Sequence, residues 1–342
     1  MPNLPNDPAF APGPDQRAPA PAEEITLHRA APDDLADIVT LNRVENDDQR
    51  MSADYLRWWY FDNPSGSFSL FLSRVGGRAC GMCSSNDAPF VINGRAQRAG
   101  FIQKVLTSNE VRGKGLFGKL YVRTDSDFLA RGGDCFLAFP NAVAKPIYLA
   151  KYSYSHGVYP DLTLLFTNPA HLLPGATRYE EVRALDAAFF KRPAFQFENA
   201  AVKSAEFLRW RYLSFASPHY RYVALAVRDE AAGNKEETLL GYVFLKKIRK
   251  QGLPVFVLMD VACHAPAALG PLLAQARRYA ARQLSVGVLY LGNPLIDSAT
   301  RGTARKVWPR QFDFLVKGRE QADTDALAGT TFNFFFGDLD FM

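Results

Sequence analysis

The residues best suited to chemistry in this chain lie between Thr107 and Leu120, in the run Thr-Ser-Asn-Glu-Val-Arg-Gly-Lys-Gly-Leu-Phe-Gly-Lys-Leu. Gly113 and Gly115 have no Cβ atom, so the backbone can turn sharply there and approach a ligand closely. A strand-like apolar run precedes this stretch and a helical run follows it, so the N–H groups of the first helical turn would point toward an anion. The stretch therefore predicts a phosphate-binding loop.

The same glycines also match parts of two well-known phosphate-binding motifs, but the match is poorer. The dinucleotide pattern G-x-G-x-x-G requires an acidic residue after the next strand, whereas Asp134 precedes that strand. Gly118 and Lys119 fit the end of the P-loop pattern G-x-x-x-x-G-K, but Leu120 stands where a serine or threonine must bind the metal. Both alternatives are therefore disfavoured.

The elements around the loop do not form a simple βαβ unit. Hydrophobic alternation, turn residues and helix start signals predict a strand, a helix, three further strands, the loop, a second helix and a last strand. In order, these are Ile25–Arg29, a helix opening at Pro32–Asp34, Ser69–Arg74, Arg78–Ser84, Ala99–Thr107, a helix over 115–130, and Cys135–Phe139.

In this setting residues 110–116 resemble the acyl-CoA pyrophosphate loop of the GNAT superfamily of N-acyltransferases, whose usual pattern is Q/R-x-x-G-x-G/A. Phe117 departs from the small residue that usually ends this pattern. Downstream, Asn141, Ala144 and Tyr148 match the family's N-x-x-A-x-x-x-Y stretch. The resemblance covers about residues 25–165 and implies acetyl-CoA as the acyl donor. It also implies direct attack of an amine on the thioester, without a covalent enzyme intermediate.

The resemblance assigns roles to particular residues. The candidate cofactor-binding residues are Val105, Thr107, Arg112, Gly113, Lys114, Gly115, Leu116 and Phe117. Tyr148 is the candidate acid that protonates the departing thiolate, or else an aromatic side chain packed beside the cofactor. Asn141 would bind the pantetheine arm or a water, or cap the following helix. Glu110 is a candidate base, at a position that usually lies on the solvated surface.

An internal repeat is the second large signal. The segment Ser52–Tyr60 recurs as Ser204–Tyr212, an offset of 152 residues, and both copies contain Leu-Arg-Trp. At the same offset the loop residues 112–115 become His264-Ala-Pro-Ala267, without glycines or cations. The sequence therefore predicts a tandem GNAT-like protein with a degenerate C-terminal copy. The Leu-Arg-Trp segments are expected to pack between the first helix and the sheet.

The predicted fold class is α/β (α+β), with two GNAT-like domains, each a mixed, mostly antiparallel twisted sheet flanked by helices. Residues 1–23 are rich in proline and alanine and are expected to be a disordered tail. The predicted domains are 24–168, with the CoA site, and 179–342, the degenerate copy; residues 169–178 form the predicted linker.

Composition limits the other classes of function. The net charge is only +5 and the cations are dispersed, so the sequence does not indicate nucleic acid as a partner. No apolar run is long enough for a membrane span, which predicts no membrane association and a cytoplasmic protein. No metal site is expected, because the histidines are scattered and only Cys80 and Cys83 have ligand spacing. In a strand, that spacing would place the two thiols on opposite faces.

The sequence thus predicts an acyl-CoA-dependent N-acyltransferase acting on a small-molecule amine, with an amino sugar as one candidate acceptor. Two alternatives remain open. One is a catalytically idle acyl-CoA binding or regulatory protein, and the other is a transferase of related tandem fold that takes an aminoacyl group from a charged tRNA.

Overall fold

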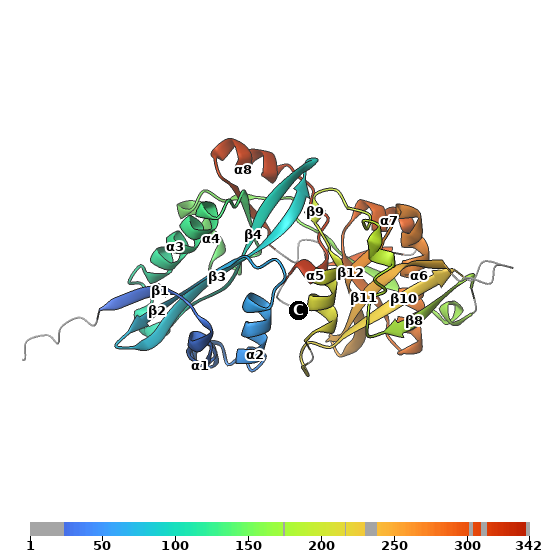
Figure 1. Ribbon diagram of the computed structural model, residues 1–342, viewed down its shortest axis with the longest axis horizontal. Helices are drawn as coiled ribbons and strands as arrows, with labels where there is room; N and C mark the ends of the chain where they lie inside the picture. Colours follow the sequence, from blue (N-terminus) through green and yellow to red (C-terminus); the bar gives the residue numbers. More distant parts are fainter. Residues whose placement is uncertain are drawn as a thin grey trace, which may run out of the picture.

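The computed structural model describes residues 24–173, 175–215, 217–229, 238–300, 304–308 and 313–339, with the backbone alone described over 304–308. Two twisted sheets lie side by side, each with helices packed against it (Figure 1). The predicted α/β (α+β) class with two mixed sheets is therefore confirmed. The predicted tail, residues 1–23, lies outside the described residues.

The helices and strands follow one another in a similar order in the two halves of the chain. The first half contains β1 (Ile25–Arg29), α1 (Leu35–Asn46), α2 (Ala53–Leu56), a π-helical turn η2 (Arg57–Phe61), β2 (Phe68–Val75), β3 (Arg78–Ile92), β4 (Arg95–Thr107), α3 (Leu116–Ala130), β5 (Cys135–Ala138), α4 (Lys145–Lys151), β6 (Ser155–His156) and β7 (Leu162–Phe166). The second half contains β8 (Thr177–Val182), β9 (Ala200–Ala201), α5 (Ala205–Leu213), β10 (Tyr222–Asp229), β11 (Thr238–Lys250), β12 (Leu253–Cys263), α6 (Leu269–Arg282), β13 (Gly287–Leu291), α7 (Pro294–Ala299), β14 (Ala304–Trp308), β15 (Leu315–Gly318) and α8 (Gln321–Ala328).

The two sheets exchange strands: the first contains β9 and β15 from the second half of the chain, and the second contains β7 from the first half. The first sheet has the order β1-β2-β3-β4-β5-β15-β6, with β9 paired to β3, and the second has the order β14-β7-β13-β12-β11-β10-β8. Strand β7 from the first half lies between β13 and β14, and β15 from the second half lies between β5 and β6. The predicted boundary at 168 follows β7, whereas the one at 179 falls within β8, and each sheet contains at least one strand from the other half of the chain.

The elements predicted around the glycine loop are confirmed. Strand β4 ends at Thr107, α3 begins at Leu116, and β5 starts at Cys135. Strands β3 and β4 are longer than expected, since their hairpin continues to a turn at Asn93 and Gly94, whose φ angles are 50° and 73°. Beside this extension, β9 pairs with β3 and so joins the second half of the chain to the first sheet.

The expectation that Cys80 and Cys83 lie on opposite faces is wrong. Both thiols belong to one apolar cluster with Leu116 and Leu120 of α3. The alternation breaks because the register between β2 and β3 shifts at Cys80, which adds a residue to β3. Both cysteines are buried and free, in keeping with the predicted structural role.

The first repeated segment packs, as predicted, in one buried cluster with α1 and with strands β2, β3 and β4. The two repeated segments also pack against each other. Trp58 Nε1 donates a hydrogen bond to the carbonyl oxygen of Trp210 over 3.1 Å, and Trp210 Nε1 donates to that of Trp58 over 2.9 Å. Their rings stack with centroids 5.0 Å apart. Ser52 and Ser204 cap the two helices in the same way. The repeat therefore forms a buried, reciprocal contact between the halves.

A buried charged cluster fixes the C-terminal segment to the second sheet. Lys203 Nζ lies 3.0 Å from Asp260 Oδ2 and also pairs with Asp338. Tyr212 donates a hydrogen bond to the same oxygen of Asp260 over 2.9 Å. Burial raises the pKa of Asp260 and the charge of Lys203 lowers it, with a net rise to about 6. The cluster holds the segment after α8 against β12, while β15 and α8 themselves lie on the first sheet (Figure 1).

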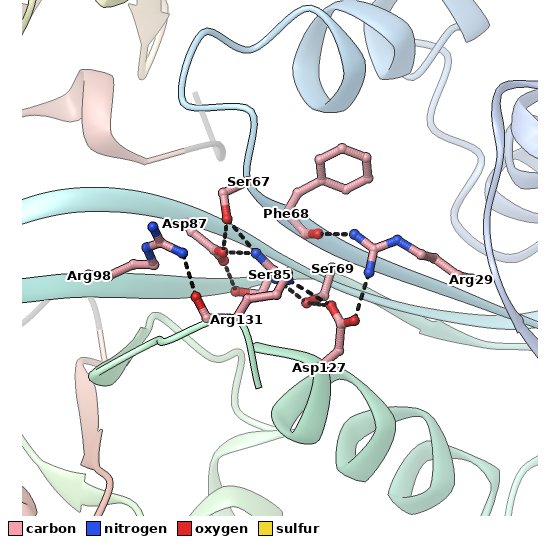
Figure 2. A network of polar contacts seen from close by, with 9 residues as sticks. All are labelled: Arg29, Ser67, Phe68, Ser69, Ser85, Asp87, Arg98, Asp127 and Arg131. Atoms are coloured by element: carbon pink, nitrogen blue, oxygen red, sulfur yellow. Dashed lines mark hydrogen bonds and ion pairs between the residues drawn. The ribbon is translucent and has the colours of Figure 1, made fainter. Parts of the chain in front are cut away.

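A polar network holds the C-terminal end of α3 on the first sheet (Figure 2). Arg131 donates a hydrogen bond to Ser69 Oγ over 2.7 Å and forms an ion pair with buried Asp87 on β3. Asp127 accepts a hydrogen bond from Ser69 Oγ over 2.7 Å and pairs with Arg29 Nη1 at 2.7 Å. Because α3 is fixed at this end, the direction of its N-terminus, where the glycine loop lies, is set by the sheet.

Candidate functional site

The glycine loop has the backbone that the sequence predicts. Gly113 and Gly115 have φ angles of +79° and +73°, a left-handed backbone conformation that residues with a Cβ atom rarely adopt. A Cβ atom added at either glycine would meet nothing within 4 Å, so the loop faces open space. The loop thus leaves room for a ligand directly against its backbone.

Helix α3 begins immediately after the loop, with Gly115 as its N-cap residue and no side-chain cap. The N–H groups of a first helical turn have no partner within their helix and carry the positive end of its dipole. These residues line a groove of about 930 Å³. Its walls are residues 102–107 of β4, residues 111–113 and 115–118 of the loop and α3, and residues 139–141 with α4 on the far side. This arrangement suits an elongated ligand with an anionic end.

The groove lies where β4 and β5 cease to pair. These parallel strands are paired only from Ala99 to Ile102 on β4, and β4 then continues to Thr107 whereas β5 ends at Ala138. Main-chain groups along this part of β4 can therefore pair with a ligand in the manner of an added strand.

Seven of the eight predicted cofactor-binding residues line this groove. They are Val105, Thr107, Arg112, Gly113, Gly115, Leu116 and Phe117. Lys114 is exposed and does not line it. Arg112 donates a hydrogen bond from Nε to the carbonyl oxygen of Thr107 over 3.2 Å, and its Nη2 lies 3.8 Å from Glu45 Oε2. Its guanidinium is thus held beside the loop, while its side chain stays 58% exposed.

Tyr148 lines the groove from α4 and is 2% exposed. Its ring packs edge-on against Phe117, Tyr121 and Tyr154, with centroids 5.9, 5.7 and 5.0 Å away. Burial raises the pKa of Tyr148 well above its usual value. The residue is therefore both part of an aromatic cluster and a protonated phenol at neutral pH, so the roles of acid and of packing residue both remain predictions.

Asn141 also lines the groove, and its Oδ1 accepts hydrogen bonds from the N–H groups of Val143 and Ala144 over 3.1 and 2.9 Å. This is the capping contact that the sequence allowed. Glu110 lies outside the groove, on the surface, where it forms an ion pair with Arg78. The structure therefore places Asn141 with Tyr148 and does not bring Glu110 to them.

A second pocket of about 290 Å³ lies beside the groove. It is lined by α1, the segment after it, β4 and Leu339 from the C-terminal segment. Lys104, which also lines the groove, was not singled out from the sequence. The sequence shows Lys104 beside Gln103 in a strand that also contains Arg95 and Arg98, so nothing in it distinguishes this lysine from one on the surface.

The corresponding position in the second half has a different backbone. After β12, Ala265 is extended with φ −151° and ψ 150°, and Pro266 starts a short 3-10 helix. His264 lies against Phe189, with ring centroids 4.1 Å apart. This loop offers neither the left-handed glycines nor the cations of its counterpart.

Within the described residues, no group of three or more histidine, cysteine, aspartate or glutamate side chains could hold a metal ion. Over the same residues, none of the helices has both the length and the apolar character needed to cross a membrane.

No family model and no curated protein sequence matches this chain. Solved structures do resemble it. A GCN5-related N-acetyltransferase from Anabaena variabilis has 12% sequence identity and a TM-score of 0.62, over 90% of this chain and 75% of that one. One from Kribbella flavida has 15% identity and a TM-score of 0.62, over 90% and 74%. The N-myristoyltransferase of Saccharomyces cerevisiae, solved with myristoyl-CoA, has 13% identity and a TM-score of 0.53, over 91% and 86%. The fold is therefore the one found in GCN5-related N-acetyltransferases.

Proposed function

We propose that this protein is an acyl-CoA-dependent N-acyltransferase of the GNAT superfamily, with acetyl-CoA as its donor. The observation that carries the proposal is the groove between β4 and α4, closed at one end by left-handed glycines and the uncapped start of α3. That end suits a diphosphate, and the strand-like wall suits a pantetheine arm. The similarity in fold to known N-acetyltransferases supports the same assignment.

In the proposed reaction, acetyl-CoA supplies an activated carbonyl as a thioester. The loop and the guanidinium of Arg112 bind the diphosphate, and β4 orients the arm. Tyr148 donates its proton to the departing thiolate, and its raised pKa keeps that proton available at neutral pH. Asn141 holds the start of α4 and thereby the position of Tyr148.

We also propose that the second half is a degenerate copy that does not bind CoA. Supporting this, β2, β3, β4, α3 and β5 are followed in the same order by β10, β11, β12, α6 and β13. The exchanged strands β7 and β15 occupy corresponding places. Its loop at 264–267 lacks the features of the groove, so the second half would act as a structural partner and as a wall of the acceptor site.

The proposed acceptor is a small-molecule amine, with an amino sugar as the first class to test. A sugar is proposed because the segment Trp210-Arg211-Tyr212 and the late run Asp338-Leu-Asp340 resemble those of tandem GNAT-like proteins associated with bacterial surface polysaccharides. The side chain of Asp338 forms an ion pair with Lys203, and Asp340 lies outside the described residues. The absence of nucleic-acid and membrane partners, and the cytoplasmic location, stay predictions.

The functional test is release of free thiol from acetyl-CoA in the presence of a panel of amines that includes amino sugars, alongside calorimetry of CoA binding. We expect binding together with amine-dependent thiol release. Binding without turnover across the panel would favour the idle acyl-CoA binding protein. Failure to bind CoA would refute the proposal and favour the tRNA-dependent alternative.

Replacing Tyr148 with phenylalanine should lower kcat about 10²-fold, because the thiolate loses its acid, while CoA affinity changes little. The matched control is Tyr152→Phe, which removes a hydroxyl from a tyrosine on the same groove. Steady-state kinetics and calorimetry check both variants. Equal loss in the two variants, or none, would assign Tyr148 to packing.

A further inference from the structure

The groove and the second pocket share one wall. Residues 102–106 of β4, together with Asn46 and Phe139, line both. This common wall begins at Ile102, the last residue of β4 that pairs with β5. Two molecules bound in the two pockets would therefore approach each other across this part of β4.

Lys104 has the only titratable side chain in this shared wall. Its φ angle is +46°, and β4 carries an extra residue here, because Leu106 is opposite Met82 while Gln103 is opposite Ser84. Such a bulge redirects side chains relative to a regular strand. The side chain of Lys104 is turned toward α2 and η2, where Nζ donates a hydrogen bond to Tyr55 Oη over 2.9 Å.

Aromatic rings and other charges surround this amine. Nζ lies 4.8 Å from the ring centroid of Tyr55 and 5.4 Å from that of Trp59. Burial lowers the pKa of Lys104 most strongly, Arg211 on α5 and Arg50 after α1 lower it further, and Asp48 raises it, for a net pKa of about 7. Asp48 is itself paired with Arg50 at 2.9 Å, which limits its effect on the lysine. The amine is therefore substantially neutral near physiological pH.

We propose that Lys104 is the general base of the acyl transfer, and that the acceptor amine binds in the second pocket. This inference rests on the proposed function. The nitrogen of the acceptor attacks the thioester carbonyl carbon, a C–N bond forms, and the C–S bond breaks as the thiolate leaves. The proton lost by that nitrogen passes to Nζ of Lys104, which becomes an ammonium group, and the thiolate takes a proton from Tyr148. Before the next cycle Lys104 releases its proton to solvent and the phenolate of Tyr148 takes up a proton from solvent.

The first test needs no acceptor. Competitive labelling of the full chain with acetic anhydride over a range of pH, read by peptide mass spectrometry, reports the pKa of each lysine. Lys104 should become reactive with a midpoint near pH 7, well below the usual lysine value of about 10.4, and exposed Lys119 on α3 serves as the internal reference for labelling. A midpoint for Lys104 above about pH 9 would overturn the assignment.

The second test uses Lys104→Met and Lys104→Arg, with Lys119→Met as the matched control, and an amine that the wild-type protein turns over. Both Lys104 variants should lose about 10²- to 10⁴-fold in kcat and retain CoA affinity, because neither side chain can accept a proton at these pH values. The kcat of the wild-type protein should rise with pH through about 7. This rise should be absent from the pH–rate profiles of both Lys104 variants. A rise caused by titration of the acceptor amine itself should remain in all three proteins.

The outcomes separate the two claims. Wild-type protein that fails to bind CoA in calorimetry would refute the proposed function. CoA binding and turnover with an unchanged rate and pH profile in Lys104→Met would refute only the role of Lys104. Recovery of activity in Lys104→Arg would show that a positive charge is needed there and would likewise refute the base.

Discussion

An aspartate in place of Gly115 should reduce CoA affinity on the order of 10³-fold or more. Gly115 has a φ angle of +73°, and the space beside it is open, so the new side chain would enter the groove itself. A carboxylate there would stand beside the diphosphate, and two like charges about 4 Å apart repel by about 4 kcal/mol near a protein surface. Calorimetry with CoA measures the loss directly.

The hairpin tip provides a matched control for this variant. Gly94 has the same φ angle of +73° and also has nothing within 4 Å of an added Cβ. Gly94→Asp therefore introduces the same charge and the same backbone strain at the β3–β4 turn, outside the groove. It should bind CoA like the wild-type protein. Equal affinity of Gly115→Asp and wild-type protein would contradict the assignment of the site.

Replacing Lys203 with methionine should lower the free energy of unfolding by about 3–5 kcal/mol at neutral pH, because it leaves buried carboxylates without their cation. The side chains of Asp260 and Asp338 are 0% and 2% exposed, so water cannot replace the ammonium group. Denaturant unfolding of the variant and of wild-type protein gives the difference. Lys191→Met removes an exposed lysine from the same half and should change stability by less than about 0.5 kcal/mol.

The pH dependence of this deficit has a definite sign. In the wild-type fold the pKa of Asp260 is raised to about 6, above its unfolded value, so its contribution to stability is fully present at low pH and falls as the pH rises through about 6. Loss of Lys203 removes the charge that lowers this pKa and shifts it further upward. The deficit should therefore be larger at pH 7 than at pH 5, where Asp260 is protonated. A deficit independent of pH would contradict this account of the cluster.

Local sequence signals predicted the backbone around the glycine loop better than they predicted long-range contacts. The strand ending at Thr107, the left-handed Gly113 and Gly115, and the helix starting at Leu116 are all determined by neighbouring residues, and the structure has them as expected. The long β3–β4 hairpin could also have been predicted, because Asn93-Gly94 is a strong turn signal between alternating residues. The pairing of this hairpin with β9, in contrast, depends on tertiary packing.

Other features had no local signal. The bulge that places Cys80 and Cys83 in one cluster, and the bulge at Lys104, arise from strand register, which depends on both partners of each pair. The repeat was visible in the sequence, but the reciprocal hydrogen bonds of Trp58 and Trp210 follow from how the halves meet. The placement of β7 in the second sheet and of β15 in the first likewise depends on distant partner strands, so it could not be predicted from any short segment of the sequence.

That exchange affects how the chain can fold during synthesis. The first sheet has an unpaired edge at β5 until residues 315–318 emerge from the ribosome, and β7 has no partner until residues 287–291 have been made. Exposed strand edges in an unfinished chain favour wrong pairing and aggregation. The groove that we assign to CoA therefore belongs to a sheet that is completed only when nearly all of the polypeptide exists, and a nascent first half would depend on protection of its open edge until then.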